Sequence, residues 1–494
     1  MTTISNEFKN LVSVNIDEIP LLNSLKSYSE RDIDCFDVPG HVKDQGVKIL
    51  NQYFGEHIMR MDINSSPIMD NVANPNGVIK EAQKLLADAY KADEAFFITN
   101  GTTQAIHAMI LSTINPGDKV LIPRNIHKSV INALILTGGI PVFIQPEFDD
   151  YLGISLNISP QKVKDIIDKE EDLKAIFVLN PTYYGACTDL KEIINICHEK
   201  DILVLVDEAH GAHFKFHKEL PPSSMEMGAD MSAVSIHKTG GALTQASALL
   251  INKKSIDYKK VLQSINMLQS TSASYLLMAS IDGARANLIL NGEQQLSQAL
   301  SLAKYAKDRL NKIKGIKVLS TELIEKDGVK FIDETKLCIN VKGLNRTGFE
   351  VYDLLYKNFS VQAELGDLYN ILVLVSIGTT KKNIDNLIKS IEIIASMQSK
   401  EELFKQIDIK QINPITKLNP REAFYSAKES IDIKKCVNRI CAESIMAYPP
   451  GIPIVAPGEL ITQEIIEYIE LLKENNAYLT DMKDKKLETV LVIK

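Results

Sequence analysis

The stretch 233–252, AVSIHKTGGALTQASALLIN, decides both the fold and the chemistry that we expect of this chain. An apolar run delivers Ser235, His237 and Lys238 into a turn made by two glycines. A lysine at the buried end of a strand lies where burial lowers its pKa and leaves a neutral amine. Such an amine can attack a carbonyl carbon and form a Schiff base. Taken alone, the segment fits an exposed lysine in a surface turn equally well.

A second segment, VLVDEAHG at 204–211, places an acid at the end of another apolar run. Asp207 there is the residue type expected beside a pyridinium nitrogen, which it keeps protonated so that the ring can accept electrons. Lys238 and Asp207 together predict a site for pyridoxal 5′-phosphate (PLP), held by Lys238 as a Schiff base. A DEAH sequence also occurs in nucleotide-driven helicases, but these need a GxxxxGK[ST] loop. The chain has no Gly-Lys dipeptide, which excludes that class.

Two further segments follow strand-like runs and open helices. In FFITNGTTQAIHAM, at 96–109, Thr102 and Thr103 start a helix whose free amides and dipole can hold a phosphate, although threonine is also an ordinary helix cap. In IPRNIHKSVINA, at 122–133, His127 can stack its flat ring on a pyridine face, although a lone histidine is more often structural.

A metal site is the main alternative use of the histidines that follow Asp207. The spacing of His210, His213 and His217 allows one, but Asp207 and His210 flank a tight turn rather than one helix face. We therefore expect no metal. The six cysteines are scattered and form no CxxC pair, which favours reduced thiols in a cytoplasmic protein over a disulfide frame or a zinc site.

The wider pattern is that of an α/β protein with a mostly parallel sheet. From about residue 78, apolar runs of four to seven residues alternate with helical periodicity, as expected of strands buried on both faces. Ligands bind at the carboxyl ends of such strands. We expect an N-terminal arm at 1–45, a large PLP-binding domain at 46–290, a small α+β domain at 291–398 and a C-terminal subdomain at 399–494.

Composition excludes several classes of protein. The net charge of −8 makes nucleic acid a poor partner, because an acidic chain repels phosphate backbones. No run of about 18 apolar residues indicates a membrane span, and the N-terminal MTTISNEFKN lacks the pattern of a signal peptide.

The pattern SxHKxGGxxTQAS, spanning 235–247, resembles the PLP-lysine signature of the Orn/Lys/Arg decarboxylase family of fold type I. Segments NGTT, PRNIHKS, VDEAHGAH and YPPGIPIVAPGE resemble its other marks, in the same order, from about residue 16 to 480. The resemblance implies an aspartate-aminotransferase-like fold and a homodimer, or a larger homo-oligomer, with active sites at the subunit interface.

The resemblance also implies roles for individual residues. It makes Lys238 the Schiff-base lysine, Asp207 the pyridinium partner and His127 the stacking ring. Four residues resemble phosphate-site residues: Thr102, Thr103, Ser235 and His237. Thr271, in STSAS at 270–274, resembles the segment that reaches the partner subunit's phosphate, and Tyr448 and Glu459 resemble parts of the substrate pocket.

Two segments depart from the family pattern. PGHVKDQG at 39–46 has Val42 inserted in the usual PGHK, and MDINSSPIMDNVANP at 61–75 replaces a TELPGLDDLHHP-like stretch. We expect both segments to approach the substrate. The N-terminal wing of the large family members is absent from the sequence, which favours a dimer or tetramer over a decamer.

The resulting functional expectation is PLP-dependent decarboxylation of a small basic amino acid. Arginine, giving agmatine, is the first choice, because short wingless members of the family are often assigned to it; lysine, giving cadaverine, and ornithine, giving putrescine, follow. A PLP aminotransferase or carbon–carbon lyase and a non-enzymatic scaffold are the alternatives, since a fold does not by itself fix a reaction.

Overall fold

The computed structural model of the chain describes residues 19–66, 68–397, 414–447, 451–475 and 477–494. A seven-stranded sheet with the order β1-β10-β9-β8-β6-β2-β3 forms its centre. Only β10 runs antiparallel to the other six strands. The strands are β1 (Glu94–Ile98), β2 (Lys119–Pro123), β3 (Ile140–Ile144), β6 (Leu173–Leu179), β8 (Leu203–Asp207), β9 (Met231–Val234) and β10 (Ser247–Ile251).

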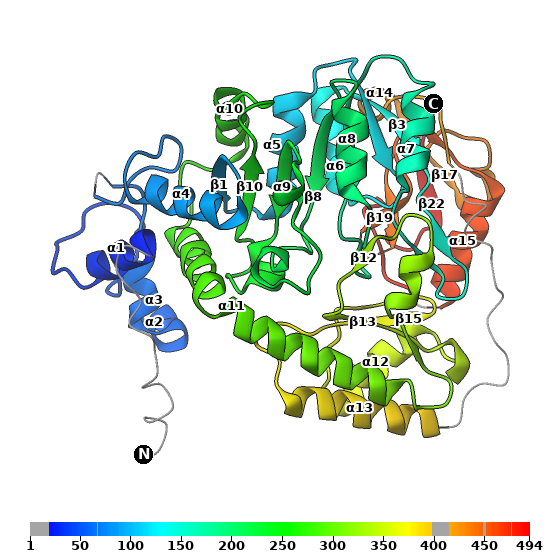
Figure 1. The fold of residues 1–494 in the computed structure, drawn as a ribbon. Helices are drawn as coiled ribbons and strands as arrows, with labels where there is room; N and C mark the ends of the chain where they lie inside the picture. The colour runs from blue at the N-terminus through cyan, green and yellow to red at the C-terminus, as the bar shows by residue number, and fades with distance from the viewer. Residues whose placement is uncertain (1–18, 67, 398–413, 448–450, 476) are drawn as a thin grey trace.

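Helices cover both faces of this sheet, which explains why its strands are apolar throughout (Figure 1). One face packs against α5 (Gly101–Thr113), α6 (Lys128–Thr137) and α10 (Tyr258–Leu268). The other packs against α7 (Pro160–Ile167), α8 (Leu190–His198) and α9 (Ser224–Met227). The predicted fold class is therefore confirmed.

The small domain is an antiparallel sheet of order β11-β13-β15-β14, covered by three helices (Figure 1). The strands are β11 (Lys317–Val318), β13 (Lys336–Asn340), β14 (Leu365–Gly366) and β15 (Asn370–Leu374), and the helices are α11 (Tyr275–Leu310), α12 (Gly348–Phe359) and α13 (Lys381–Ser396). The boundary predicted at 290/291 falls inside α11, because this 36-residue helix belongs to the core of the large domain at its start and to that of the small domain at its end.

Short elements join these two domains and build the C-terminal part. The hairpin of β4 (Phe148–Asp149) and β5 (Ile154–Ser155) follows β3, and β7 (Ala186–Cys187) of the large domain pairs with β12 (Phe331–Ile332). The C-terminal part contains β16 (Ile415–Thr416), α14 (Pro420–Tyr425), β17 (Lys428–Asp432), β18 (Ile445–Ala447), β19 (Ile452–Val455), β20 (Glu459–Leu460), α15 (Gln463–Glu474), β21 (Leu479–Thr480) and β22 (Thr489–Ile493).

The N-terminal arm packs on its own chain through α1 (Pro20–Ser29). Leu21 and Leu25 are fully buried, and the backbone amide of Leu21 donates to the Asp282 carboxylate at 3.0 Å. The arm continues through α2 (Lys48–Phe54) and α3 (Glu56–Met61) to α4 (Val78–Tyr90). Helix α4 is capped at a distance by buried Asp70, whose carboxylate accepts the amides of Gly77 and Ile79 at 2.8 and 3.1 Å.

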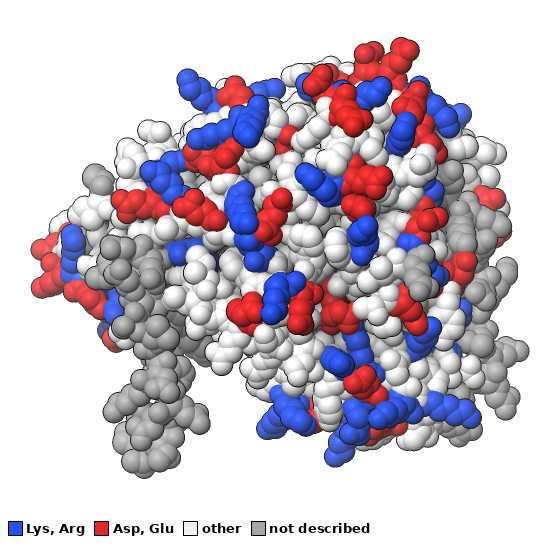
Figure 2. Space-filling model, viewed as in Figure 1, with Lys and Arg blue, Asp and Glu red and all other residues white. Residues whose placement is uncertain are grey.

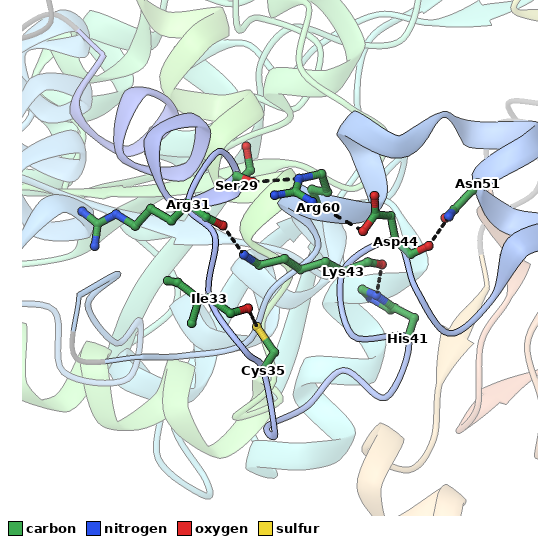
Figure 3. Close-up of polar contacts among 9 residues, drawn as sticks. All are labelled: Ser29, Arg31, Ile33, Cys35, His41, Lys43, Asp44, Asn51 and Arg60. Carbon is green, nitrogen blue, oxygen red and sulfur yellow. Dashed lines mark hydrogen bonds and ion pairs between the residues drawn. The ribbon is translucent and has the colours of Figure 1, made fainter.

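The atypical segment 39–46 makes its described polar contacts within the arm (Figure 3). The His41 Nδ1–H donates to the Lys43 carbonyl at 2.6 Å, and the Lys43 ammonium donates to the Arg31 carbonyl at 2.8 Å. His41 Nε2 also lies 3.2 Å from the carboxylate of Asp62. These contacts explain how the segment is held, and an approach to the substrate stays a prediction.

Candidate active site

Lys238 lies at the carboxyl edge of the central sheet, just after β9. The chain turns there through a single π-helical turn, Ile236–Gly240, which ends at Gly241 with a φ of +93°. The Lys238 Nζ atom lies 2.9 Å from Nε2 of His210. Burial lowers the pKa of the Lys238 amine, and the negative charge of Asp207 acts in the opposite direction. Lys238 is half-buried, and its lowered pKa favours the neutral amine.

Asp207 is the last residue of β8 and is only 3% exposed. Its Oδ1 accepts the Ala209 amide at 3.0 Å. Burial raises the pKa of the Asp207 carboxyl, while the charge of Lys238 and the Ala209 amide lower it. The structure thus brings the predicted lysine and acid together beneath the edge of the sheet, from two strands that are direct neighbours.

A cluster of hydroxyl groups lies at the start of α5. Thr102 Oγ1 is 2.5 Å from Ser235 Oγ and donates to Ser247 Oγ at 3.0 Å, and all three residues are buried. Gly101 opens the helix with a φ of +73°, and a side chain there would meet nothing within 4 Å. Hydroxyls and free amides at the N-terminus of a 13-residue helix are a donor set suited to a phosphate.

Two other predicted phosphate residues border this cluster. Thr103 is an exposed residue in the first turn of α5. The His237 Nδ1–H donates to the Ala246 carbonyl at 3.0 Å, which leaves its Nε2 for another partner. Ser247 was not predicted as a phosphate-site residue, although it lies in the same stretch, 233–252, as Ser235 and Lys238. Strand β10 places it opposite Ile98, the last residue of β1.

His127 caps α6, with its Nδ1 accepting the Ser129 amide at 3.2 Å. Burial and the positive charge of Lys238 lower the pKa of His127 to about 4, so the ring is neutral at pH 7. A neutral, half-buried ring at the end of β2 is suited to stacking on a flat ligand. The sequence predicted this position from the helix start that follows the strand.

His210 and Tyr183 were not predicted as site residues. The ring of His210 packs edge-on against that of Tyr183 with centroids 4.8 Å apart, and Lys238 Nζ lies 5.7 Å from the Tyr183 centroid. Burial and the Lys238 charge lower the pKa of His210 well below its usual range. The sequence signal for His210 is its place three residues after Asp207, at the carboxyl end of strand β8.

The three histidines of the metal alternative have separate partners. His213 Nε2 lies 3.2 Å from Asp333, and His217 Nε2 lies 2.9 Å from Ser297 Oγ. Among the residues that the structure describes, no group of three or more His, Cys, Asp or Glu side chains is placed to hold a metal ion.

Glu364, in the small domain just before β14, is a further acid at the site that the sequence did not indicate. Its side chain is exposed, and its negative charge raises the pKa of both Lys238 and His237. Its carboxylate therefore lies within electrostatic reach of Lys238 and His237.

The residues predicted for the substrate pocket and the subunit interface lie in different environments. Glu459 is 1% exposed, and its Oε2 lies 2.7 Å from an Arg124 Nη2 and accepts the Ala456 amide at 2.7 Å. The Glu459 carboxylate thus forms a buried ion pair within the chain, which argues against a contact with a substrate cation. Thr271 lies in an exposed segment before α11, and Tyr448 lies outside the described residues.

A cavity of about 520 Å³ lies next to this site, where the large, small and C-terminal domains meet. Arg124, Tyr183, Asp367, Ile454 and Tyr468 are among its lining residues. Tyr183 lines this cavity, and its ring centroid also lies 5.7 Å from Lys238 Nζ.

The residues at the sheet edge fit PLP as a group. The hydroxyl cluster and the start of α5 suit its phosphate, and buried Asp207 suits a protonated ring nitrogen. His210 Nδ1 and Thr239 Oγ1 are buried without a hydrogen-bond partner among the described residues, so the site holds polar atoms that the chain leaves unsatisfied.

Over most of the face in Figure 2, acidic and basic side chains are interspersed, and Lys and Arg side chains gather along its lower edge. Among the described residues, no helix is both long and apolar enough to cross a lipid bilayer.

Comparison with known protein families identifies the chain. The model of the Orn/Lys/Arg decarboxylase major domain matches residues 19–383, and that of the C-terminal domain matches residues 398–480. The chain belongs to the Orn/Lys/Arg decarboxylase family. This membership confirms the predicted family and the prediction of an amino-acid decarboxylase.

Relatives of this Orn/Lys/Arg decarboxylase cover nearly its whole length. It is 41% identical to an arginine decarboxylase of Bacillus subtilis, over 97% of this chain and 98% of that protein. It is 24% identical to a lysine decarboxylase of Pseudomonas aeruginosa, over 92% of this chain and 76% of that protein. The solved lysine decarboxylase of Francisella novicida has the same fold, with a TM-score of 0.82 at 21% identity, over 96% of this chain and 81% of that one.

Proposed function

We propose that this decarboxylase converts arginine to agmatine and carbon dioxide with PLP as its cofactor. The observation that carries the proposal is Lys238, half-buried at the edge of the sheet within electrostatic reach of Asp207, in a chain 41% identical to an arginine decarboxylase over 97% of its length. Relatives named lysine decarboxylase are more distant, at 24% identity. Lysine and ornithine are the alternative substrates.

The residues of the site divide the task of holding the cofactor. Lys238 would bind it covalently, Asp207 would pair with the ring nitrogen and His127 would cover one face of the ring. The phosphate would lie at the start of α5, with Thr102, Thr103, Ser235 and His237, and with Thr271 contributed from a partner subunit. The hydroxyl cluster of Thr102, Ser235 and Ser247 supports this arrangement.

PLP supplies an electron sink that accepts the electron pair released when the bond from Cα to the carboxylate breaks. The protein must hold that bond in position and manage the protons around it. His210 Nε2 lies 2.9 Å from Lys238 Nζ, and its pKa is lowered well below the usual range, so the neutral ring can accept a hydrogen bond from the lysine amine and orient it. Tyr183 packs on His210 and shields this pair from one side.

Glu364 is our candidate for the cationic end of the substrate. It is an exposed carboxylate within electrostatic reach of Lys238, and a guanidinium needs an accessible acid with which it can form two parallel hydrogen bonds. Glu459 is less suited, because it is 1% exposed and its Oε2 is already paired with Arg124.

We also propose a homodimer whose subunits share their active sites. Large apolar side chains are exposed on the N-terminal arm, with Phe36 at 98% and Tyr53 at 81% exposure, and Met267, close to Thr271 in sequence, is 71% exposed. Exposed apolar groups of this size mark surfaces that associate. Sedimentation of the PLP-loaded protein at twice the 55.0 kDa mass of the chain would support the dimer, and a monomer would contradict it.

The proposed reaction is tested by offering the PLP-loaded protein arginine, lysine and ornithine separately and measuring the amine formed. We expect agmatine from arginine, at a kcat/KM at least tenfold above those for the other two amino acids. A preference for lysine or ornithine would contradict the substrate, and formation of a keto acid in place of carbon dioxide would contradict the reaction.

A further inference from the structure

Lys336 is a buried cation behind the active site that the mechanism above does not use. It is the first residue of β13 in the small domain and is 1% exposed. Its ammonium donates a hydrogen bond to the backbone carbonyl of Tyr183, 3.1 Å away in the large domain. Lysine is seldom fully buried, because removing its charge from water is costly. A buried lysine at this position therefore needs interactions that offset the cost of removing its charge from water.

The segment that carries Lys336 is fixed by a polar network. Thr335 Oγ1 donates to Asp333 Oδ1 at 2.6 Å, and the other oxygen of Asp333 lies 3.2 Å from His213 Nε2. The Asp333 amide donates to the Gly185 carbonyl at 2.9 Å. The lysine is thus presented to the large domain from a rigid base.

The segment that Lys336 binds is the one that forms the wall of the active site. Residues 183–185 lie between the end of β6 and β7, and β7 pairs with β12 of the small domain. Gly185 has a φ of +95°, and a Cβ there would lie 3.2 Å from the Lys336 Cδ. The loop therefore passes directly over the lysine stem, while the Tyr183 ring contacts His210 on its other side.

We propose that Lys336 is a positioning residue: its ammonium holds the Tyr183 carbonyl and so fixes the Tyr183 ring against His210. The inference rests on the proposed PLP-dependent reaction, since His210 is the group next to the reactive lysine. It also makes the junction of the two domains part of the active site, because the lysine and the loop come from different domains.

The charge of Lys336 has a second effect on the same groups. It is one of the positive charges that lower the pKa of His210, together with those of Lys238, His213 and His237. Burial lowers the pKa of Lys336 itself to about 8; the charge of Lys238 also lowers it, while Asp333, Glu364 and Cys187 raise it. Removing the Lys336 charge should therefore make neighbouring cations easier to form.

The test uses Lys336→Met in the PLP-loaded protein, with Lys307→Met as the matched control. Lys307 is a second buried lysine of the small domain, and its ammonium pairs with Glu334, next to Asp333 in sequence. The readouts are kcat, KM and the pH midpoint of the visible absorption of the bound cofactor. For Lys336→Met we expect kcat to fall about tenfold or more, as misplacement at an active site can cost up to about 100-fold. We also expect KM within threefold and an absorption midpoint about one pH unit higher.

The double variant Tyr183→Ala/Lys336→Met separates positioning from a purely structural role. If Lys336 acts through the Tyr183 ring, adding Lys336→Met to Tyr183→Ala should change kcat less than about twofold. Lys336→Arg serves where the methionine variant does not fold: it retains the charge but moves the donor, so we expect a lower kcat with the midpoint unchanged.

Three results would each overturn the inference. Lys336→Met could keep the kcat and the absorption midpoint of the wild type, or Lys307→Met could show the same changes as Lys336→Met. The third is that Lys336→Met lowers kcat by the same factor whether residue 183 is tyrosine or alanine. The absorption midpoint does not depend on turnover. If the wild type acts on none of the three amino acids, the proposed function fails while the midpoints still decide the role of Lys336.

Discussion

The ion pair between Arg124 and Glu459 predicts how the C-terminal domain is attached and separates a structural glutamate from a substrate-binding one. Both side chains are at least nine-tenths buried, and their atoms lie 2.7 Å apart. Arg124 follows β2 of the large domain, whereas Glu459 opens β20. Arg124→Met leaves the Glu459 carboxylate buried without its cation, which is strongly destabilising in proteins.

The size of the effect follows from the protonation of Glu459. Burial raises the pKa of this carboxyl above its usual 4.5, and Arg124 is a main group opposing the rise. In Arg124→Met the carboxyl must take up a proton to stay buried. Protonating the carboxyl costs about 1.36 kcal/mol for each pH unit above its usual pKa, which is up to about 3.4 kcal/mol at pH 7. At pH 5 the same cost is about 0.7 kcal/mol. Because the pKa of the carboxyl is higher in the folded protein than in the unfolded chain, the free energy of unfolding falls as the pH rises above the pKa of the unfolded chain. Arg124→Met should therefore be less stable at pH 7 than at pH 5.

The assay is thermal unfolding of wild type and Arg124→Met at both pH values. With an unfolding entropy of about 2.1 cal/mol/K per residue, a loss of 3.4 kcal/mol lowers the Tm of a chain of this length by about 3 °C, and by under about 1 °C at pH 5. Glu459→Gln keeps an acceptor for the Ala456 amide and should change the KM for arginine less than about twofold. Equal Tm losses at both pH values, or a tenfold rise in KM with Tm unchanged in Glu459→Gln, would refute this account.

Three other predictions concern the site itself. Asp207→Asn removes the charge proposed for the ring nitrogen, and kcat should fall about 10- to 100-fold, as for loss of a charged hydrogen bond, while a fluorescence titration still detects bound PLP; an unchanged kcat would contradict its role. Glu364→Gln should raise the KM for arginine about tenfold with kcat within threefold, whereas Glu467→Gln, at an exposed position on α15, should leave both unchanged. His127, with a pKa lowered to about 4, stabilises the PLP-free protein above pH 6.5, and this contribution is lost as pH falls toward 4. The Tm advantage of the PLP-free wild type over His127→Asn should therefore shrink over that range, and a constant difference would exclude this titration.

The sequence predicted the parts of the site that lie at the ends of buried strands. Lys238 and Asp207 could be predicted because each directly follows an apolar run, and such runs place the next residues at one edge of a parallel sheet. The central sheet and most helices could be predicted for the same reason, since strands buried on both faces differ clearly from the amphipathic helices between them.

The residues that the sequence did not predict reach the site through the tertiary fold. Glu364 and Lys336 come from the small domain, and nothing in their local pattern points to a cofactor. Glu459 was assigned to the substrate because an acid in a family-like segment says nothing about its partner, which lies 335 positions away in the chain. The boundary at 290 lies within α11, between Ala284 in the core of the large domain and Ala299 in that of the small domain, so no break in the helix marks it.

The measurement that tests the central claim most directly is release of labelled carbon dioxide from carboxyl-labelled arginine by wild type and Lys238→Ala, both incubated with PLP. We predict steady release by the wild type, with one agmatine formed per carbon dioxide, and no release above background by Lys238→Ala. Comparable release by both proteins would contradict the assignment of Lys238, and no release by a wild type that has bound PLP would contradict arginine decarboxylation itself.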